Sequence, residues 1–368
     1  MMKYIKLFIP VLVAMIIFIL PTPEGLSQNT WLYFSIFIGV VIGLILEPIP
    51  AALVGLVGVG ICIWFKIGPA GSGDVTKVIK SSEAVSWGLA GFSNSTVWLI
   101  FAAFMIGLGY QKSGLGRRMA LILIKLLGKT TLGLGYAIAI ADGILAPFIP
   151  SNSARSGGTL YPIVSSIPPM IGSYPDKEPR KIGGYLIWVS LAATCVTSSM
   201  FFTGLAPNLL AMETATKSGV EAISWFGWFM AFLPAGIILF IATPYLTYIF
   251  YPPTSKGSKE ASIWAGEELK KIGSITSKEW SMIGLAFFAL IFWIFGDFFN
   301  VNATTVALSV MIAMVLLNII TWDDVLTNKA AWGILAWFGS LVTLAGGLKN
   351  VGFLNFIADI GGKYLSTF

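Results

Sequence analysis

The chain has 368 residues, of which 56% are hydrophobic and 11% are charged, and its formal net charge is +6. A soluble protein of this length would have about twice the charged fraction, so the composition excludes an ordinary soluble fold and predicts an all-α polytopic membrane protein. The basic residues fall in short loops between apolar runs, which indicates membrane topology rather than a nucleic-acid partner.

Histidine is absent, which removes the commonest metal ligand and proton relay. Cys62 and Cys195 both lie in apolar runs, where we expect core or lipid-facing side chains. The sequence shows no cluster of acids, no nucleophile with a base and no metal-ligand spacing, so we predict no catalytic residue and no enzyme. We expect no cofactor, with sodium as the one open alternative.

The first apolar run, about residues 7–20, follows Lys3 and Lys6 in the manner of a signal peptide. Its exit, PTPEG, lacks a small-residue cleavage pattern, which favours an uncleaved first transmembrane helix. Later apolar runs predict further helices. These lie at about 31–46, 51–65, 95–110, 183–202, 225–250, 281–298, 303–320 and 331–348, with one long apolar stretch at 119–149.

A polar segment interrupts the apolar sequence LAPFIPSNSARSGGTLYP at 145–162. Two prolines before it and two glycines after it make a continuous helix unfavourable. At membrane depth, non-helical backbone persists only where it is buried in protein or lines a wet cavity. We therefore predict the tip of a re-entrant hairpin. The alternatives are an ordinary outer loop and a helix break capped by Ser151 or Ser153.

Ser151, Asn152 and Ser153 offer hydroxyls and an amide that suit a substrate carboxylate or a hard cation such as sodium. Half-helices that end at the tip would aim their positive N-termini at an anion. Arg155 carries a charge that is costly inside a membrane. Three roles are open for it: binding a substrate carboxylate, standing in for a co-transported cation, or pairing with Asp142.

A second break, TGLAPN at 203–208, interrupts another apolar segment. Gly204 and Pro207 would free backbone carbonyls, and Thr203 and Asn208 add polar side chains. A proline-kinked helix is the simpler alternative. Two broken elements in one half of the chain favour a transporter more strongly than either one does.

The charges of the loops predict an integral protein of the cytoplasmic (inner) membrane with a cytoplasmic N-terminus. The basic segments 112–129, 177–181 and 253–279 are then inside, whereas 68–94 and Lys349 are outside. Segments 112–129 and 177–181 share a side if the chain between them enters and returns, or if it crosses twice. The positive-inside rule therefore permits the hairpin without requiring it.

The order of elements repeats along the chain. Trp31 and Trp280 each begin a pair of apolar runs, and 97–115 aligns loosely with 331–353. Because the charges place the ends of the two copies on opposite sides, the sequence predicts an inverted repeat, as in many secondary transporters. A second SNS-like tip is due about 235 residues after Ser151. The chain ends at Phe368, so we expect it to be truncated before that tip.

Three segments resemble the divalent anion:sodium symporter family: PSNSARSGGTLYPI at 150–163, FFTGLAPNLLA at 201–211, and WFGWFMAFLPAGIILFIATPYLTYIFYPP at 225–253. The resemblance covers most of the chain and points to the branch of bacterial citrate/succinate and tartrate/succinate antiporters and plastid 2-oxoglutarate/malate translocators. It implies a homodimer in which a mobile transport domain moves as an elevator against a scaffold domain. It also implies two re-entrant hairpins per protomer, each tipped with Ser-Asn-Thr, that hold the substrate carboxylates.

The resemblance assigns roles residue by residue. Ser151 and Asn152 match the first two positions of the family's tip, and Ser153 replaces the threonine but keeps a hydroxyl. Gly204 matches the glycine of the broken helix that helps to bind the first sodium in symporters, so a sodium site at Ser151, Asn152 and Gly204 is possible. Pro147 stands where the resemblance implies a serine ligand in symporters, which weighs against sodium.

The resemblance also divides the chain into domains. We expect residues 1–115 to be scaffold helices of the first repeat and 116–250 to be its transport-domain hairpin and broken helix. Residues 251–279 are then a cytoplasmic linker, 280–349 the scaffold helices of the second repeat, and 350–368 the start of a second hairpin.

These observations predict an elevator-type secondary transporter that exchanges di- or tricarboxylates such as succinate, malate, 2-oxoglutarate, citrate or tartrate. The expected partners are this small-molecule substrate, the lipid bilayer and a second copy of the chain. A sodium-coupled symporter is the alternative, and a membrane enzyme or a channel is less favoured. The expected substrate-binding residues are Ser151, Asn152, Ser153, Arg155, Thr203, Gly204, Pro207 and Asn208.

Overall fold

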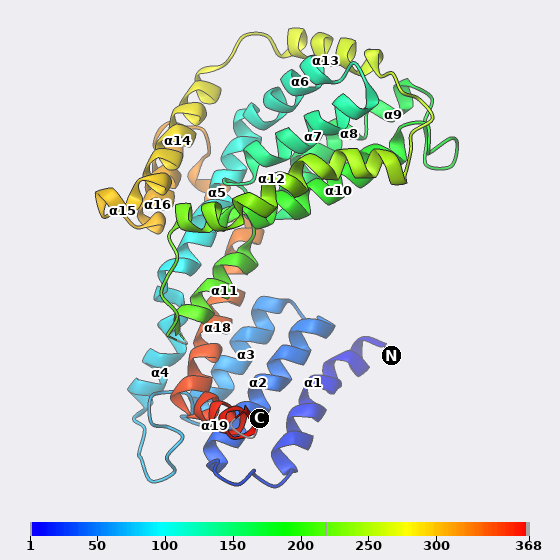
Figure 1. The fold of residues 1–368 in the computed structure, drawn as a ribbon. Helices are drawn as coiled ribbons and strands as arrows, with labels where there is room; N and C mark the ends of the chain where they lie inside the picture. Colours follow the sequence, from blue (N-terminus) through cyan, green and yellow to red (C-terminus); the bar gives the residue numbers. More distant parts are fainter. Residues whose placement is uncertain (1, 218, 366–368) are drawn as a thin grey trace. The chain divides into compact units, whose positions relative to one another are not determined.

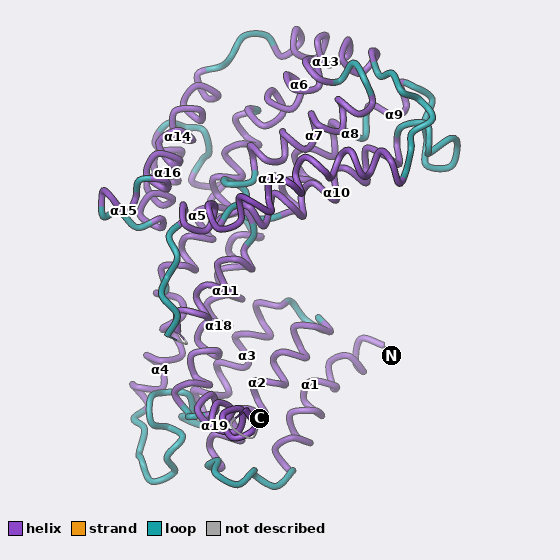
Figure 2. Tube along the Cα trace, viewed as in Figure 1, coloured by secondary structure: helices purple, strands orange, loops and turns teal. Residues whose placement is uncertain are grey.

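The computed structural model describes residues 2–217 and 219–365. Within these ranges the regular structure is helical (Figure 2), apart from an isolated antiparallel bridge between Thr130 and Gly257. The all-α part of the predicted fold is therefore confirmed. The helices of Figure 1 gather into two compact units. Unit 1 comprises Met1–Phe101, Lys217–Val220 and Lys329–Phe368, and unit 2 comprises Ala102–Thr216 and Glu221–Asn328.

Five helices in the described part of the chain are long and apolar enough to cross a membrane. They are α2 (Gln28–Leu46), α10 (Gly183–Met200), α12 (Trp225–Phe250), α14 (Ser277–Ile294) and α18 (Lys329–Asn350). A sixth candidate is bent by 41° and joins α4 (Ser81–Ala90) and η1 (Gly91–Ser93) to α5 (Ser95–Ser113). Shorter apolar helices are α1 (Met2–Ile19), α3 (Ala51–Trp64) and α16 (Ala303–Leu316). They coincide with apolar runs expected from the sequence, except α4 and η1, which lie in the segment 68–94 that was expected to be a polar connection.

Unit 1 is organised around Tyr33 of α2, whose side chain is fully buried. Its hydroxyl donates a hydrogen bond of 2.7 Å to the carbonyl of Leu344 in α18. A glycine makes this contact possible, because a Cβ atom on Gly347 would lie only 1.9 Å from the Tyr33 hydroxyl. Helices α2, α3 and α18 can therefore pack closely around one buried side chain.

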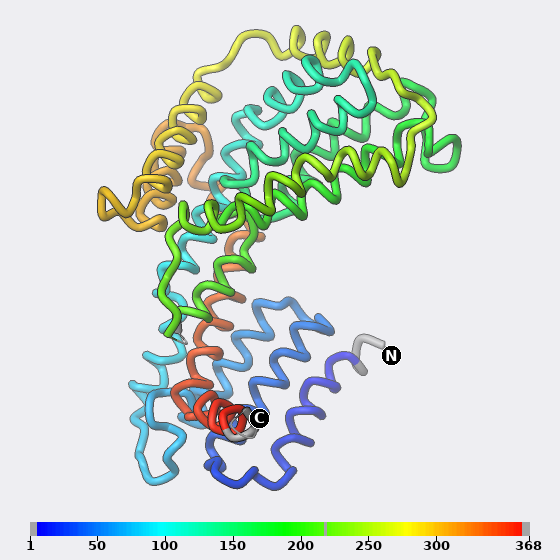
Figure 3. Tube along the Cα trace, viewed as in Figure 1, coloured from blue at the N-terminus to red at the C-terminus, as the bar shows by residue number. Residues whose placement is uncertain are grey.

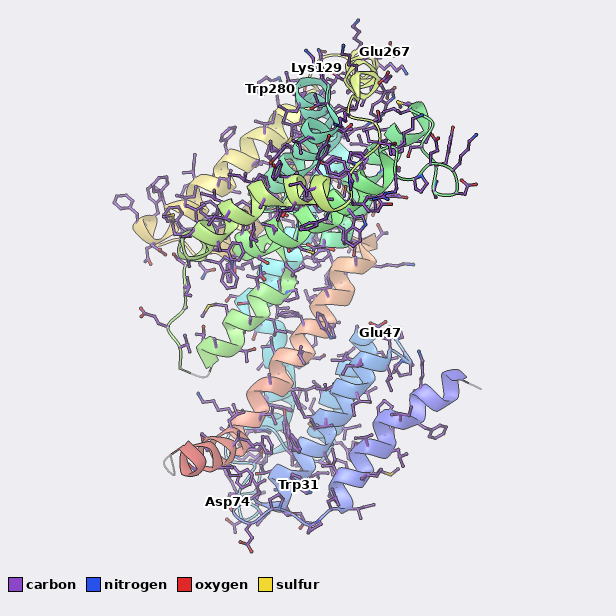
Figure 4. The ribbon with its side chains drawn as sticks, turned by 45° about the vertical axis from the view of Figure 1, so that its right-hand side comes forward. Trp31, Glu47, Asp74, Lys129, Glu267 and Trp280 are labelled. Carbon is purple, nitrogen blue, oxygen red and sulfur yellow. The ribbon has the colours of Figure 1, made fainter. Side chains whose placement is uncertain are left out.

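At one end of unit 1, two segments that the loop charges assign to the same side of the membrane are in contact. Asn350 donates a side-chain hydrogen bond of 2.9 Å to the carbonyl of Gly68. The loop that contains Asp74 lies at one end of the unit, and Glu47 lies at the other (Figure 4). The segments 68–94 and 349–351, which the sequence assigned to the same side, thus meet. Helix α19 (Phe353–Leu365) follows them, and residues 366–368 of the expected second hairpin lie outside the described residues.

Unit 2 contains the polar breaks. The apolar stretch 119–149, expected to be continuous, is two helices, because Gly128 ends α6 (Leu115–Leu127) and the Thr130 hydroxyl caps α7 (Thr131–Leu145). The other elements of this unit, besides α10, α12, α14 and α16, are η2 (Ser153–Leu160), α8 (Tyr161–Val164), α9 (Ile167–Met170), η3 (Phe202–Gly204), α11 (Ala206–Lys217), α13 (Lys259–Ile272), α15 (Gly296–Phe299) and α17 (Trp322–Thr327).

The charged linker expected at 251–279 contains the amphipathic helix α13, which lies antiparallel against α6 (Figures 1 and 3). At one end Ser262 donates to the carbonyl of Lys125 at 2.7 Å, and at the other Arg117 pairs with Glu268 at 2.8 Å. The basic segments 112–129 and 253–279, assigned to one side of the membrane, are therefore in contact.

A buried ion pair joins α6 to the start of α14. Arg118 contacts both carboxylate oxygens of Glu279, at 2.6 and 3.1 Å, and also donates to the carbonyls of Gly273 and Ser274. The two side chains are 7% and 2% exposed. Glu279 also completes a capping box with Thr276, so the same carboxylate fixes the beginning of α14.

We predict that Arg118→Ala lowers the free energy of unfolding by about 3 kcal/mol, because it leaves a buried carboxylate without its cation. Arg117→Ala removes the neighbouring, exposed ion pair and should leave the unfolding midpoint nearly unchanged. Thermal unfolding in detergent, followed by tryptophan fluorescence, compares the two variants. Equal shifts for both would contradict a structural role for the buried pair.

Candidate functional site

The polar segment at 145–162 is a break between two helical limbs. The first limb, α7, ends at Leu145, and the chain is non-helical until Asn152, where the π-helical segment η2 begins the second limb. Pro147 and Pro150 lack the N–H groups that a continuous helix would need. The hydroxyl of Ser151 accepts a hydrogen bond of 3.3 Å from the N–H of Ala154, so the capping role considered for this residue is present.

The two limbs start and finish at the same end of unit 2. The N–H of Thr131 donates to the carbonyl of Lys256 at 3.1 Å, and the N–H of Thr254 donates to the carbonyl of Arg180 at 3.0 Å. One loop, residues 254–256, therefore contacts both the start of α7 and the stretch of chain that follows α9, beyond the second limb. Helix α7 has 15 residues, which makes it about 22 Å long, short of the roughly 30 Å of a hydrocarbon core. The second limb, η2 followed by α8, is shorter still.

The second break separates α10 from α11 completely, rather than kinking one helix. Phe201 and Leu205 are extended, with the short turn η3 between them. Asn208 donates from its side-chain amide to the carbonyls of Ser198 and Phe201, at 2.8 and 3.1 Å. The Phe201 carbonyl also accepts from the N–H of Gly204 at 2.9 Å, so Asn208 adds to the hydrogen bonds that stabilise the interruption.

The two breaks are in direct contact. The hydroxyl of Thr203 donates to the carbonyl of Pro147 at 2.6 Å, and the N–H of Ala206 donates to the carbonyl of Pro150 at 3.1 Å. Trp225, at the start of α12, donates to the Thr203 hydroxyl at 3.0 Å. Polar groups of one break thus satisfy the free backbone groups of the other.

Arg155 joins the two breaks from inside, and its side chain is fully buried. Its Nη1 atom donates to the carbonyls of Ile149 at 2.8 Å and Gly204 at 3.0 Å, one from each break. Its Nη2 atom lies 3.1 Å from Asn152 Oδ1 and 3.0 Å from Thr194 Oγ1. Every nitrogen of the guanidinium therefore has at least one oxygen partner.

Asp142 of α7 supplies the negative charge that Arg155 faces. Its Oδ2 atom accepts from Arg155 Nε at 3.1 Å and from the hydroxyl of Thr197. Its side chain is 1% exposed. Pairing with Asp142 was one of three roles open for Arg155, and the structure contains this pair; a substrate contact by Arg155 stays a prediction.

The eight predicted site residues fall into two groups. Arg155, Thr203 and Gly204 are buried, and their hydrogen bonds join the two breaks. The others keep accessible surface, and they are Ser151, Asn152 and Asn208, which are half-buried, and Ser153 and Pro207, which are exposed. Sequence reasoning missed Thr194 and Thr197, although their spacing of three residues on α10 puts both on one helix face.

The oxygens considered for sodium already have partners. Asn152 Oδ1 and the carbonyl of Gly204 both accept from Arg155, and the Ser151 hydroxyl accepts from the backbone. In the described residues no group of three or more His, Cys, Asp or Glu side chains lies close enough to hold a metal ion. The guanidinium of Arg155 is thus the cation that the Asn152 and Gly204 oxygens contact.

A cavity of about 420 Å³ borders the second limb on the side of α6 and α13. Gly158, Thr159 and Pro162 line it from the limb, and Gln111, Arg117 and Trp264 line it from α5, α6 and α13. Part of the second limb therefore borders open space, whereas Leu160, Ile163 and Val164 of the same limb are buried.

Apolar helices of spanning length, together with two facing helix breaks that carry polar side chains, define a polytopic membrane transporter. The chain belongs to the sodium:sulfate symporter family, because the family model described as "Sodium:sulfate symporter transmembrane region" matches residues 1–367. The family expected from the tip and break motifs is confirmed.

Relatives in this family are antiporters. The chain is 43% identical over 373 residues to the citrate/succinate antiporter of Escherichia coli (strain K12), covering 99% of this chain and 75% of that protein. It is 45% identical over 364 residues to the L-tartrate/succinate antiporter of the same strain, covering 98% and 74%, and to that of Shigella flexneri to the same extent. The protein is therefore a transporter and not an enzyme, as predicted.

We predict that Arg155→Lys lowers the free energy of unfolding by about 2 kcal/mol or more, although the charge is kept. An ammonium has three donors at one point and cannot reach oxygens on both breaks, on α7 and on α10. Arg117→Lys is the matched control, because a lysine still pairs with Glu268 there. Thermal unfolding in detergent gives the unfolding midpoint of both variants. An unchanged midpoint in Arg155→Lys would contradict the conclusion that Arg155 stabilises the protein by joining the two breaks.

Proposed function

We propose that this protein is a secondary active transporter that exchanges di- and tricarboxylates of the succinate, malate, 2-oxoglutarate, citrate or tartrate class. The observation that carries the proposal is the guanidinium of Arg155, fixed among oxygens where the two helix breaks meet. The names of the relatives, which are citrate/succinate and L-tartrate/succinate antiporters, support this substrate class.

The substrate carboxylate binds at the accessible side of the breaks. Ser151, Asn152 and Ser153 supply hydroxyl and amide donors, and Pro207 and Asn208 form the facing wall. Helical segments begin on both sides of this surface, at Ser153 and at Ala206. Their N-terminal ends carry partial positive charge, which favours an anion.

Arg155 takes the place of a co-transported cation, and this favours exchange over symport. A guanidinium that is part of the chain does not dissociate with the substrate, and it already uses Asn152 Oδ1 and the Gly204 carbonyl. A sodium ion at these oxygens would face a positive charge within hydrogen-bond distance. The alternative, sodium-coupled symport with ligands from Ser151, Asn152 and Gly204, is supported by the family description.

Transport follows an elevator mechanism in a homodimer with a cytoplasmic N-terminus, and the hairpin made by α7, η2 and α8 is re-entrant. The short limbs and their common base support the hairpin. We assign residues 1–115 and 280–349 to the two scaffold halves of an inverted repeat, 116–250 to the transport domain of the first, and 350–368 to the start of its counterpart. The cavity behind the second limb supports a movable tip.

We predict that liposomes containing the protein take up labelled succinate only when they are loaded with unlabelled dicarboxylate, and that sodium has no effect. Uptake of labelled malate, citrate and 2-oxoglutarate under the same conditions gives the range of substrates. Protein-free liposomes control for leakage. Uptake into empty liposomes that requires a sodium gradient would overturn exchange in favour of symport.

We predict that Asn152→Ala and Ser151→Ala each lower the apparent affinity for succinate about tenfold or more, because each removes a hydrogen bond to a charged carboxylate. Ser165→Ala is the control for Ser151→Ala, since Ser165 lies on the same hairpin, beyond the second limb. Exchange rates measured over a range of succinate concentrations separate affinity from maximal rate. Unchanged affinity in both tip variants would remove the site assignment.

A further inference from the structure

The ion pair between Asp142 and Arg155 is the basis for an inference that rests on the proposed function and deepens it. We propose that Asp142 is a positioning residue that sets the net charge beneath the substrate site, and that this charge selects between divalent and trivalent anions. Asp142 does not touch the substrate, but acts through Arg155 and Asn152.

The hydrogen bonds of Asp142 indicate that its charge matters more than its shape. Its Oδ2 atom has two partners, Arg155 Nε and Thr197 Oγ1, whereas its Oδ1 atom is buried and has no partner among the described residues. A buried carboxylate oxygen without a partner is costly, so hydrogen bonding alone does not account for an acid here, whereas the need to neutralise the buried guanidinium does. Asparagine has the same shape and could accept from Arg155, but it lacks the charge.

The position of the pair connects this charge to the substrate. Arg155 Nη2 lies 3.1 Å from Asn152 Oδ1, and Asn152 is half-buried at the tip, where a carboxylate would bind. In the described part of the chain, Asp142 is the only carboxylate that pairs with Arg155. The two formal charges cancel, so the frame that Asp142 and Arg155 together form beneath the tip is neutral.

A neutral frame gives a clear expectation for substrate charge. Adding one positive charge beneath the site stabilises a trivalent anion more than a divalent one, because Coulomb energy scales with the charge of each. With an effective dielectric constant of about 20 and a separation of about 8 Å, the preference for the trivalent anion changes roughly thirtyfold per unit of charge. Removing the positive charge has the opposite effect.

The test is a charge series in the full chain, reconstituted in liposomes. Arg155→Gln has a frame charge of −1, the unmodified protein and the double variant Asp142→Asn/Arg155→Gln have 0, and Asp142→Asn has +1. Unlabelled citrate and succinate compete with labelled succinate in exchange at pH 7.5, where citrate is mainly trivalent and succinate divalent. The readout is the ratio of the two apparent affinities, which a loss of folded protein does not change.

We expect the citrate preference to rise roughly thirtyfold in Asp142→Asn, to fall in Arg155→Gln and to return near the original value in the double variant. Asp176→Asn, the same change at an exposed loop position, should leave the ratio unaltered. If one single variant does not fold, the other single variant and the double variant still define the trend.

A ratio that does not follow the frame charge, or a double variant that keeps the shift of Asp142→Asn, would overturn the inference while leaving exchange intact. A failure of the proposed function looks different, because the unmodified protein would then exchange neither anion, and both proposals would be overturned.

Discussion

A guanidinium buried among broken helices is the constraint on which the candidate site depends. Arg155 is fully buried, and a charge in such a place requires an opposite charge and hydrogen bonds to nearly all its donors. Asp142 supplies the charge, and carbonyls of Ile149 and Gly204 supply acceptors from both breaks. Intact helices could not supply these carbonyls, because their own N–H groups would already use them. The breaks and the arginine therefore require each other.

The same constraint explains the polar residues around the breaks. In an apolar environment each free backbone group needs a partner. Thr203, Asn208 and the N–H of Ala206 provide partners across the junction, and Trp225 in turn satisfies Thr203. Thr203 and Asn208, which were candidate ligands in the sequence, thus have structural bonds. The accessible surface that is left for a substrate is narrower, and it centres on the tip residues Ser151, Asn152 and Ser153.

The sequence predicted positions of helices better than contacts. Apolar runs gave the helices of spanning length, and proline and glycine located both breaks, because these signals are local. The division of 119–149 into α6 and α7 was missed, although Gly128 and Thr130 are ordinary signals for the end and the start of a helix. Thr194 and Thr197 could not be assigned to Arg155, since that pairing depends on how α10 packs against the hairpin.

The amphipathic helix α13 shows a second limit of prediction from sequence. Its lysines made the segment look like a solvated linker, but Ala261 and Ala265 are fully buried and face α6. The periodicity was present in the sequence, yet its meaning depended on a partner helix 130 or more residues away, as the bond from Ser258 to Gly128 shows. The local pattern of apolar residues identifies an amphipathic helix, but only the fold shows which helix covers its apolar side.

The neutrality of the Asp142–Arg155 pair bears on how the site attracts an anion. Two opposite charges in contact act as a dipole, whose field falls off more steeply with distance than that of a single charge. The frame therefore does not draw anions from afar, and attraction must come from groups that the carboxylate touches, namely the tip hydroxyls, the Asn152 amide and the helix N-termini. Such contacts depend on the position of each carboxylate. A site built in this way distinguishes organic acids mainly by the placement of their carboxylates, and total charge becomes important only when the Asp142–Arg155 frame loses its neutrality.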